Sequence, residues 1–379
     1  MTFRIFHLFT HSSITRGGAV QGIELAKLQQ ERGHQVVCLF HKSPFRRLHF
    51  TLNQPFPFPV YHRDMKNPLS YIWFARFITR VQPHIIHCHR NLALLFGFFS
   101  LRWLSSVRKT VLVINRGTTY PLPNLVVKQV FKSDGLDHVI AVSRAVKEAL
   151  IRQDGIDADK ISVIYGSFDP SRFYPERKCQ IFRNEFKIPE SVPVISTVCA
   201  IDRRKGLEYF LMAAEMVLKE IPHSRFFIVG NIDDPKYYKK LRTLVEEKGL
   251  EGHVVFTRHR SDIPDILACS DLSVSASVEG EGITGALRES LAMKKPVVAT
   301  NVSGNSELIQ DGVTGWLVRP KDAVALAKVI LEAIRNRQEA HRRAEKGYRL
   351  VRKLCSPERR YTDVMKLYEK LISLREQEL

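Results

Sequence analysis

Apolar residues gather in short runs that recur along the first half of the chain, with helical stretches between them. The runs are FRIFHLF (3–9), QVVCLF (35–40), HIIHCH (84–89), VLVIN (111–115), HVIAVS (138–143) and ISVIY (161–165). Between the first two, AVQGIELAKLQQER predicts a helix, and Gly33 stands where a helix C-cap belongs. Nearly continuous Val, Ile and Leu strands that alternate with helices indicate a parallel sheet covered on both faces.

This pattern stops at GSFDPSRFYPERKCQIFRNEFKIPESVP, a stretch rich in proline and charge, and then begins again. The later apolar runs are VISTVCA (194–200), RFFIVG (225–230), HVVFT (253–257), DLSVSAS (271–277) and PVVAT (296–300). Residues 206–219 place apolar side chains at i, i+3, i+4, i+7 and i+11, which predicts one buried helix face. The sequence ends in a long helical stretch that contains YTDVMKLYEKLISL.

The repeated pattern predicts an α/β protein with two Rossmann-like, doubly wound domains. We place the N-terminal domain at 1–170, an interdomain linker at 171–190, the C-terminal domain at 191–355 and a C-terminal helix at 356–379, which we expect to pack back toward the N-terminal domain. Ligands of such folds bind beyond the carboxyl ends of the strands.

The length of 379 residues suits two domains, and the composition is that of a globular protein. The longest apolar run, 92–101, is too short to cross a bilayer. The N-terminus has no signal-peptide pattern. The six cysteines, at 38, 88, 179, 199, 269 and 355, have no metal-binding spacing, so we expect free thiols in a reducing, cytoplasmic compartment.

The net charge of +19 is unevenly distributed along the chain. Residues 1–178 hold 25 Lys and Arg against 11 Asp and Glu, a net charge of +14, and the remainder holds 33 against 28, a net charge of +5. A basic half attracts an anionic partner, such as a phosphorylated substrate, an anionic lipid surface or nucleic acid. The alternative is a soluble surface that is simply basic.

The stretch EGEGITGALRE, residues 279–289, carries the most specific chemistry. It contains a literal G-x-G-x-x-G at 280–285, follows the apolar run at 271–277 and begins a helix. Backbone N–H groups at a glycine-rich helix start attract phosphate. A nicotinamide-binding oxidoreductase would need this loop in the first βαβ unit and an acid at the end of the next strand, where Ala299, Thr300 and Asn301 stand instead. Glu281 and Glu289, about 12 Å apart on a helix, suit the two ends of an elongated ligand better than a shared proton.

Glu281-x₇-Glu289 and the following SLAMKKPVVATNVSGNSELIQDGVTGWLV resemble the signature of retaining glycosyltransferases of family 4, which have the GT-B fold of two Rossmann-like domains facing across a cleft. RGGAVQGIELAKLQQERGH, IAVSRAVKEALIRQDGIDADKISVIYGSFDPSRFYP and VCAIDRRKGLEYFLMAA are similar to further segments of that family. The resemblance touches most of the chain. It implies an N-terminal acceptor domain and a C-terminal domain that binds a nucleotide-sugar.

The resemblance also implies roles for individual residues. Lys205 would pair with the donor diphosphate and stabilise the departing nucleotide. Glu289 would bind the ribose hydroxyls, and Glu281 would lie near the transferred sugar. The amides of Gly282, Ile283, Thr284 and Gly285 would complete the phosphate pocket, and Gly17 and Gly18 would let the first loop approach the donor phosphate or the acceptor.

The sequence departs from the family pattern at two places. Where many members have a Gly-Arg pair five residues before the lysine, this chain has Cys199-Ala200, so Arg203 or Arg204 is a candidate to supply that charge. Arg116 stands in place of a family histidine, either near the transferred sugar, as a catalytic residue, or in a structural role. His89 matches a family His-x-His at a strand end, as an acceptor-binding residue or as a buried strand histidine.

The predicted activity is retaining transfer of a sugar from a UDP- or GDP-sugar to a glycan or lipid-linked glycan, as in lipopolysaccharide or polysaccharide assembly. Neither Asp157-Ala158-Asp159 nor Asp233-Asp234 makes a convincing metal site, so we expect no metal and no cofactor. HKSPFRRLHF and YIWFARFITR suit either an anionic inner membrane or ordinary packing. No nucleic-acid module is present. The alternative functions are a non-catalytic nucleotide-binding protein and an NAD-dependent oxidoreductase.

Overall fold

The computed structural model describes residues 2–11, 17–42, 56–102, 109–179, 181–280 and 282–377. The chain divides into two compact units, one formed by Met1–Ser167 with Pro357–Leu379 and the other by Phe168–Ser356. The two-domain α/β architecture predicted from the sequence is confirmed, because each unit is built on its own parallel sheet.

The described part of the first unit contains a seven-stranded sheet in the order β3-β2-β1-β4-β5-β6-β7, with every pair parallel. Its strands are β1 (Arg4–Phe9), β2 (Gln35–His41), β3 (Val60–Arg63), β4 (Ile85–Cys88), β5 (Val111–Arg116), β6 (His138–Ala141) and β7 (Ile161–Val163). β3 is an edge strand that the sequence pattern did not reveal.

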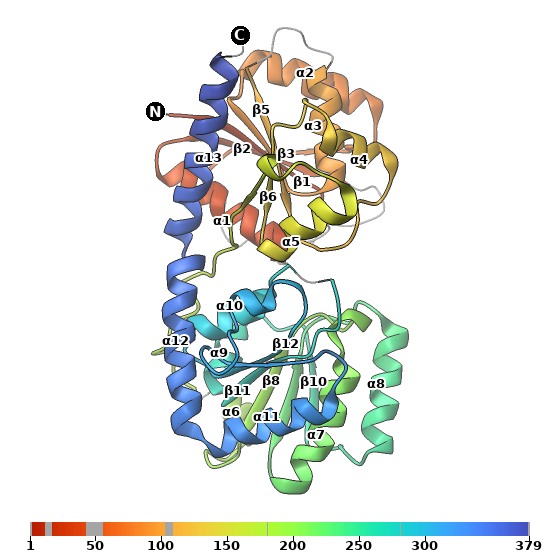
Figure 1. Ribbon diagram of the computed structural model, residues 1–379, viewed down its shortest axis with the longest axis vertical. Coiled ribbons are helices and arrows are strands. Elements are labelled where there is room, and N and C mark those ends of the chain that lie inside the picture. The colour runs from red at the N-terminus through yellow and green to blue at the C-terminus, as the bar shows by residue number, and fades with distance from the viewer. Residues whose placement is uncertain are drawn as a thin grey trace. The chain divides into compact units, whose positions relative to one another are not determined.

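Helices cover both faces of this sheet (Figure 1). One apolar layer packs against α2 (Pro68–Val81), α3 (Asn91–Arg102), α4 (Leu125–Lys132) and α5 (Arg144–Ala149), which continues as a π-helical turn at Leu150–Asp154. The opposite face packs against α1 (Gly17–Glu31) and α13 (Pro357–Gln377). Val364 and Tyr368 of α13 are buried beside Ile5 and Val113, so the last helix belongs to the core of the first unit.

The second unit has a six-stranded parallel sheet within its described residues, in the order β10-β9-β8-β11-β12-β13. The strands are β8 (Val194–Val198), β9 (Arg225–Val229), β10 (Val254–Arg258), β11 (Leu272–Ser275), β12 (Val297–Thr300) and β13 (Trp316–Val318). The strand order reverses direction at β8, where β9 lies on one side and β11 on the other. In such sheets ligands bind at this switch point.

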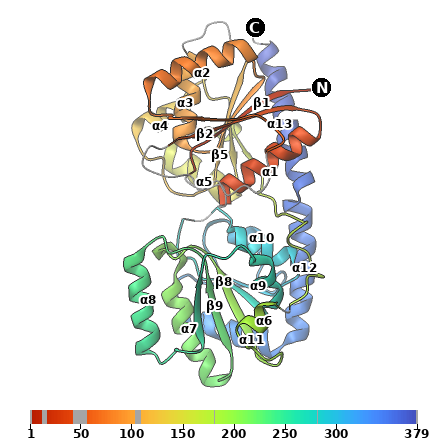
Figure 2. The same ribbon diagram turned by 180° about the vertical axis from the view of Figure 1, so that it is seen from behind.

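The helices of the second unit also form two layers (Figure 2). α7 (Leu207–Glu220), α8 (Pro235–Glu247) and α11 (Ala323–Arg335) pack on one face, and α6 (Ile181–Glu185) and α9 (Ile263–Cys269) pack on the other. α10 (Gly285–Ala292) and α12 (Arg337–Cys355) are in contact with each other. α7 begins at Leu207 and buries the side chains at 207, 210, 211 and 214, as the apolar spacing predicted.

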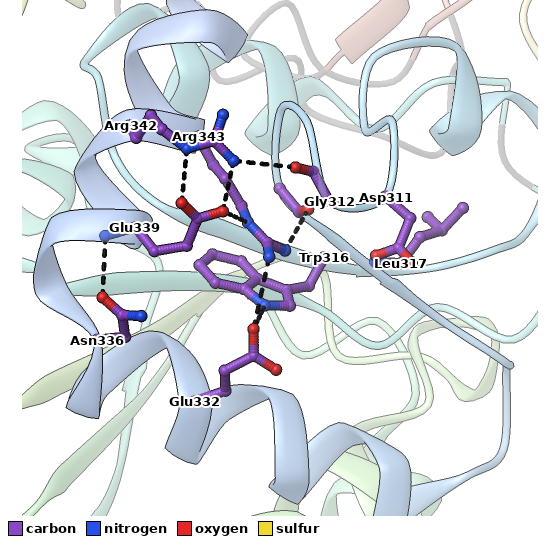
Figure 3. A network of polar contacts seen from close by, with 10 residues as sticks. Asp311, Gly312, Trp316, Leu317, Glu332, Asn336, Glu339, Arg342 and Arg343 are labelled. Atoms are coloured by element: carbon purple, nitrogen blue, oxygen red, sulfur yellow. Dashed lines mark hydrogen bonds and ion pairs between the residues drawn. The ribbon is translucent and has the colours of Figure 1, made fainter.

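A polar network holds the start of α12 against the end of the sheet (Figure 3). The Arg343 guanidinium lies 4.1 Å from the centre of the Trp316 ring, and its Nε donates to Glu339 at 2.7 Å. Trp316 Nε1 donates to Glu332 of α11 at 2.8 Å. Further along α12, a Cβ added at Gly347 would lie 2.6 Å from Leu291, so the absence of a side chain lets α12 approach α10.

Residues 171–190, which the sequence suggested as a linker, pack into the second unit. Phe182 and Ile188 are buried beside Val194 and Phe227 of its sheet. Apolar residues in this proline-rich stretch therefore serve as core, and the chain passes from one unit to the other at Ser167 and again at Ser356.

The expectation that all cysteines are free thiols is wrong for two of them. Cys179 and Cys269 form a disulfide although 90 residues separate them in the sequence. Packing of α6 against α9 brings the two segments together, which spacing along the chain could not reveal. Cys38, Cys88 and Cys355 are free thiols. The scattered cysteines therefore no longer support a reducing compartment.

The apolar run 92–101 forms most of α3, whose buried residues include Leu94, Phe96 and Phe98. Across the described ranges, no helix combines the length and the apolar character needed to cross a membrane.

Candidate functional site

The loop after β8 presents Lys205 at the switch point of the second sheet. Residues 203–205 form a 3₁₀ turn, which the Asp202 side chain caps by accepting from the Arg204 amide at 2.9 Å. Gly206 follows with φ of +59°, a left-handed conformation that glycine adopts without steric cost. α7 begins at the next residue, so Lys205 stands between a strand end and a helix start, as the sequence indicated.

The Lys205 loop lies directly against the segment that follows β11. A Cβ at Gly206 would lie only 2.2 Å from the carbonyl oxygen of Ala276, and the Val278 amide donates to the Arg204 carbonyl at 2.7 Å. The two glycine-containing loops, predicted separately from sequence, therefore meet at the carboxyl ends of adjacent strands.

Arg203 and Arg204, our candidates for the cation absent at Ala200, are both paired with carboxylates. Arg203 Nε lies 3.3 Å from Asp234, and 69% of its side chain is exposed. Arg204 donates to both carboxylate oxygens of Asp202, at 2.9 and 2.8 Å. Each guanidinium therefore already has a counter-charge.

The glycine-rich stretch begins α10. Gly282, Ile283 and Thr284 are buried, and Thr284 is the N-cap residue, although its side chain makes no capping hydrogen bond. Its hydroxyl instead donates to Asn305 Oδ1 at 3.4 Å. The first amides of α10 thus lack a side-chain cap, the arrangement that favours an anion at a helix N-terminus. Glu281 lies outside the described residues.

Glu289 lies one turn into α10, with Oε1 3.9 Å from the position of a Cβ at Gly285. Burial raises the pKa of its carboxyl, and the positive charges of Arg288 and Arg172 oppose that rise. The carboxylate therefore stands beside the glycine-rich helix start, as predicted. Arg288 is part of the same environment, and sequence reasoning did not select it because it resembles an ordinary helix residue.

In the first unit, α1 begins at Gly17 and Gly18. A Cβ at Gly17 would meet nothing within 4 Å, whereas one at Gly18 would lie 3.0 Å from His11 Nε2. Burial and the charge of Arg90 lower the pKa of His11 to about 4, so this ring is neutral near pH 7. The loop before Gly17 lies outside the described residues.

Arg116 has the contacts of a structural residue. Its guanidinium donates to the carbonyl oxygens of Tyr120 and Pro121, and the residue is only 9% exposed. The preceding residue, Asn115, contacts His89, so strand alternation directs Arg116 to the opposite face of the sheet. These carbonyl contacts agree with the structural interpretation, but Arg116 Nε has no hydrogen-bond partner among the described residues, so both interpretations stay predictions.

His89 belongs to a buried chain of hydrogen bonds whose direction can be deduced. Gln29 Oε1 can only accept, so His7 Nε2, 2.8 Å away, donates to it. Burial lowers the pKa of His7 to about 4, so the ring is neutral and its Nδ1 accepts from His89 Nε2 at 2.9 Å. His89 Nδ1 in turn accepts from the Asn115 amide at 3.1 Å. Both ring nitrogens of His89 are thus occupied within the protein.

His87 extends this cluster, with its Nδ1 2.6 Å from the Tyr368 hydroxyl. One ring nitrogen from each of His7, His87 and His89 lies within 4.8 Å of the others, a spacing that could hold a metal ion. The direct His7–His89 hydrogen bond already engages one ring nitrogen of each of these two histidines, and no carboxylate or thiolate of the described residues joins the group. The geometry is therefore that of a buried hydrogen-bonded network, whose partners Gln29 and Tyr368 come from helices that sequence spacing does not relate to the strands.

One aspartate of each pair caps a helix. Asp157 accepts from the Asp159 amide at 3.0 Å, and Asp234 accepts from the Tyr237 amide at 2.9 Å at the start of α8. Asp157 and Asp234 therefore have local structural roles.

The models of two protein families match nearly consecutive parts of the chain. "Glycosyltransferase Family 4" matches residues 15–172, and "Glycosyl transferases group 1" matches residues 179–350. The N-acetyl-alpha-D-glucosaminyl L-malate synthase of Bacillus anthracis is 25% identical over 347 residues, 86% of each chain. A UDP-Gal:alpha-D-GlcNAc-diphosphoundecaprenol alpha-1,3-galactosyltransferase of Escherichia coli is 25% identical over 328 residues, 80% of each chain.

Solved structures share the whole fold. HepE of Anabaena, crystallised with UDP and glucose, aligns with a TM-score of 0.84 at 21% identity, covering 97% of this chain and 100% of that one. A glycosyltransferase of Rickettsia africae aligns with a TM-score of 0.81 at 24% identity, covering 98% and 99%. With both halves of the chain matched and the fold shared throughout, the protein belongs to the group 1 glycosyltransferases of the GT-B fold.

Proposed function

We propose that this glycosyltransferase moves a sugar from a UDP- or GDP-sugar to a glycan or lipid-linked glycan, with retention of anomeric configuration and without a metal ion. The observation that carries the donor assignment is the contact between the Lys205–Gly206 loop and the segment after β11. It brings a cationic loop and a glycine-rich helix start together at the carboxyl ends of β8 and β11, a combination that suits a diphosphate.

Different residues of the second unit bind the different parts of the donor. Lys205 stabilises the negative charge that develops on the departing nucleotide diphosphate, and the first amides of α10 hold its oxygens. Glu289 accepts hydrogen bonds from the ribose hydroxyls, and Glu281 acts near the transferred sugar. Gly17 and Gly18, at the start of α1, let the first loop approach the donor phosphate or the acceptor, and a Cβ at Gly17 would meet nothing within 4 Å. His89 contributes to acceptor binding indirectly, by orienting Asn115 at the end of β5.

Thermal shift against UDP, GDP, ADP, CMP and their sugar conjugates tests the donor site. One nucleotide should stabilise the wild type, by about 2.7 kcal/mol at a hundredfold excess over Kd. Lys205→Ala and Glu289→Ala should lose that gain. Lys219→Ala is the matched control, because Lys219 is an exposed lysine of the same unit, on α7, paired with Glu215 at 3.5 Å. Equal stabilisation of all four proteins would contradict the assignment.

Transfer with a defined acceptor then tests the chemistry. The anomeric configuration of the product, read by NMR, should match that of the donor, and a chelator should leave the rate unchanged. Inversion, or loss of activity that an added divalent ion restores, would refute those parts of the proposal. Nucleotide binding without transfer to any glycan would favour the non-catalytic alternative.

An anionic membrane is the proposed location of a lipid-linked acceptor. The sequences of α2, α3 and α4 contain no Asp or Glu, and they carry basic residues at 76, 80, 102, 128 and 132. Leu69, Ile72, Phe99, Leu125 and Val126 on the same helices are exposed. Each basic residue near an anionic surface contributes about 1 kcal/mol.

Flotation with vesicles that contain phosphatidylglycerol tests this location, because vesicles of phosphatidylcholine alone should leave the protein unbound. Of the two sequence segments first suggested, YIWFARFITR lies in α2, where Phe74 and Ile78 are core residues. Most of HKSPFRRLHF lies outside the described residues.

A further inference from the structure

Arg288 is a buried cation at the start of α10 without an ion-pair partner among the described residues. The residue is 7% exposed, and Nη1 donates to the Ile283 carbonyl at 3.3 Å. Nη2 lies 3.7 Å from the position of a Cβ at Gly285, and Nε has no hydrogen-bond partner within the described part of the chain. A buried guanidinium with an unused N–H is costly unless an anion pairs with it.

The location of this guanidinium coincides with a helix terminus that also lacks a partner. Thr284 provides no side-chain cap for the first amides of α10. The Arg288 guanidinium contacts the same short stretch, 283–285. Gly285 has no side chain to separate them. Helix amides and a guanidinium fork both select phosphate oxygens, the amides through partial positive charge and the fork through paired N–H donors.

The other arginines near the Lys205 loop are already neutralised. Arg203 is paired with Asp234 and Arg204 with Asp202, and position 200 is alanine. Of Arg203, Arg204 and Arg288, only Arg288 has no carboxylate partner among the described residues, so it is our candidate for a second positive charge beside that of Lys205.

We propose that Arg288 is a donor-binding residue whose guanidinium hydrogen-bonds the diphosphate of the nucleotide-sugar at the start of α10. This inference rests on the proposed function and deepens it, because it assigns the compensating cation of the donor site to a residue that follows the glycine-rich loop. Neither Arg203 nor Arg204 is then needed for phosphate binding.

A second way for Arg288 to act would be through Glu289. Its charge favours the ionised form of that carboxyl, which is the form that accepts hydrogen bonds from ribose. The two roles predict different ligand dependence. Direct contact with phosphate affects only ligands that carry phosphate, whereas an effect through Glu289 affects the nucleoside as well.

Isothermal titration with uridine, UMP and UDP separates the two roles, with the guanosine series used if the wild type prefers that base. In Arg288→Leu the affinity for UDP should fall about 10- to 100-fold, the effect of losing a charge-assisted hydrogen bond, while the affinity for uridine stays unchanged. Arg288→Lys should recover part of the UDP affinity, because lysine restores the charge without the fork.

Arg183→Leu is the matched control. Arg183 is also largely covered, but it bonds the Pro189 carbonyl and Asp271 at the amino-terminal ends of the strands of the same sheet, where Asp271 accepts from the amide at the start of β8. UDP affinity should be unchanged in that variant. Unchanged UDP affinity in Arg288→Leu, or an equal loss for uridine and UDP, would overturn the inference. A wild type that binds no nucleotide of either series would overturn the proposed function, and the role of Arg288 with it.

Discussion

Polar residues lie near the carboxyl ends of the strands in both sheets, but their hydrogen-bond partners differ between the two units. In the first, His7, His89 and Asn115 bond to one another beneath the covering helices. In the second, the polar groups lie on loops around a glycine-rich helix start, and the buried Arg288 Nε has no partner among the described residues. The comparison teaches that buried polar side chains bonded to one another stabilise a fold, whereas a buried cation beside uncapped helix amides indicates a ligand site.

The largest effect is expected where a side chain would separate the two loops of the second unit. Gly206→Ala combines a φ of +59° with a Cβ 2.2 Å from the Ala276 carbonyl oxygen, so the backbone must move. We expect a loss of about 3 kcal/mol or more in the free energy of unfolding, together with loss of nucleotide binding. Urea denaturation and titration with UDP measure the two quantities.

Gly249→Ala is the control for this substitution. Gly249 has φ of +60°, but a methyl group at this position would meet nothing within 4 Å, so only the backbone conformation is penalised. That cost is about 1–2 kcal/mol, and nucleotide binding should persist. Equal effects at the two glycines would show that the contact between the loops is unimportant.

Acid should weaken the first unit through its neutral histidines. The folded-state pKa of His7 is about 4, below its ordinary value of 6.5, because burial and the charge of Arg360 disfavour the imidazolium. The unfolded chain therefore binds more protons between pH 6.5 and 4. Stability is fully present above pH 6.5 and falls as the pH drops, by about 1.4 kcal/mol per pH unit for each such histidine.

The pKa values of His87 and His89 are also lowered by burial, so they add to this slope. Hydrogen exchange measured by mass spectrometry at pH 7 and pH 5 reports each unit separately in the intact chain. β1 and β4 should lose protection at pH 5. Unchanged protection of those strands would mean that the histidines are not buried in the neutral form.

A smaller effect is expected where α1 crosses the histidine network. A Cβ at Gly22 would lie 2.5 Å from Phe9 and 2.7 Å from His89, and both rings are confined by packing. Gly22→Ala should cost about 1–3 kcal/mol through overpacking and leave UDP binding in the second unit unchanged. Gly17→Ala, on the same helix with nothing within 4 Å, should be neutral or slightly stabilising. Thermal denaturation of the two variants compares them directly.

The smallest effect is expected at the Arg343 network, away from both strand-end clusters. Arg343→Lys keeps the positive charge but loses the planar contact with Trp316 and the Nε hydrogen bond to Glu339. We expect a loss of about 1 kcal/mol, seen in chemical denaturation, with nucleotide affinity retained. A loss of affinity as large as that of Arg288→Leu would show that the anchoring of α12 controls the donor site.

The sequence alone determined the parts of this protein that depend on local order. Strand and helix periodicities predicted the two α/β domains, and glycines beside Lys205 and Thr284 located two of the loops that the structure brings together. These features are visible because each depends on neighbouring residues, through backbone conformation or the repeat of a buried face. The edge strands β3 and β13, VYHR and WLV, were missed because neither stands within a longer apolar run like those that marked the predicted strands.

Tertiary structure decided which polar groups find partners. Cys179 forms a disulfide with Cys269, and Arg203 and Arg204 form ion pairs with aspartates. His89 forms a hydrogen bond with His7 of another strand, while Arg288 Nε has no acceptor among the described residues. Most of these relations join residues that are far apart in the chain, and the balance between burial and hydrogen bonding at each depends on the packed neighbours. A charged residue on a helix is an ordinary feature of a sequence, and only its burial without a partner makes it a candidate for binding.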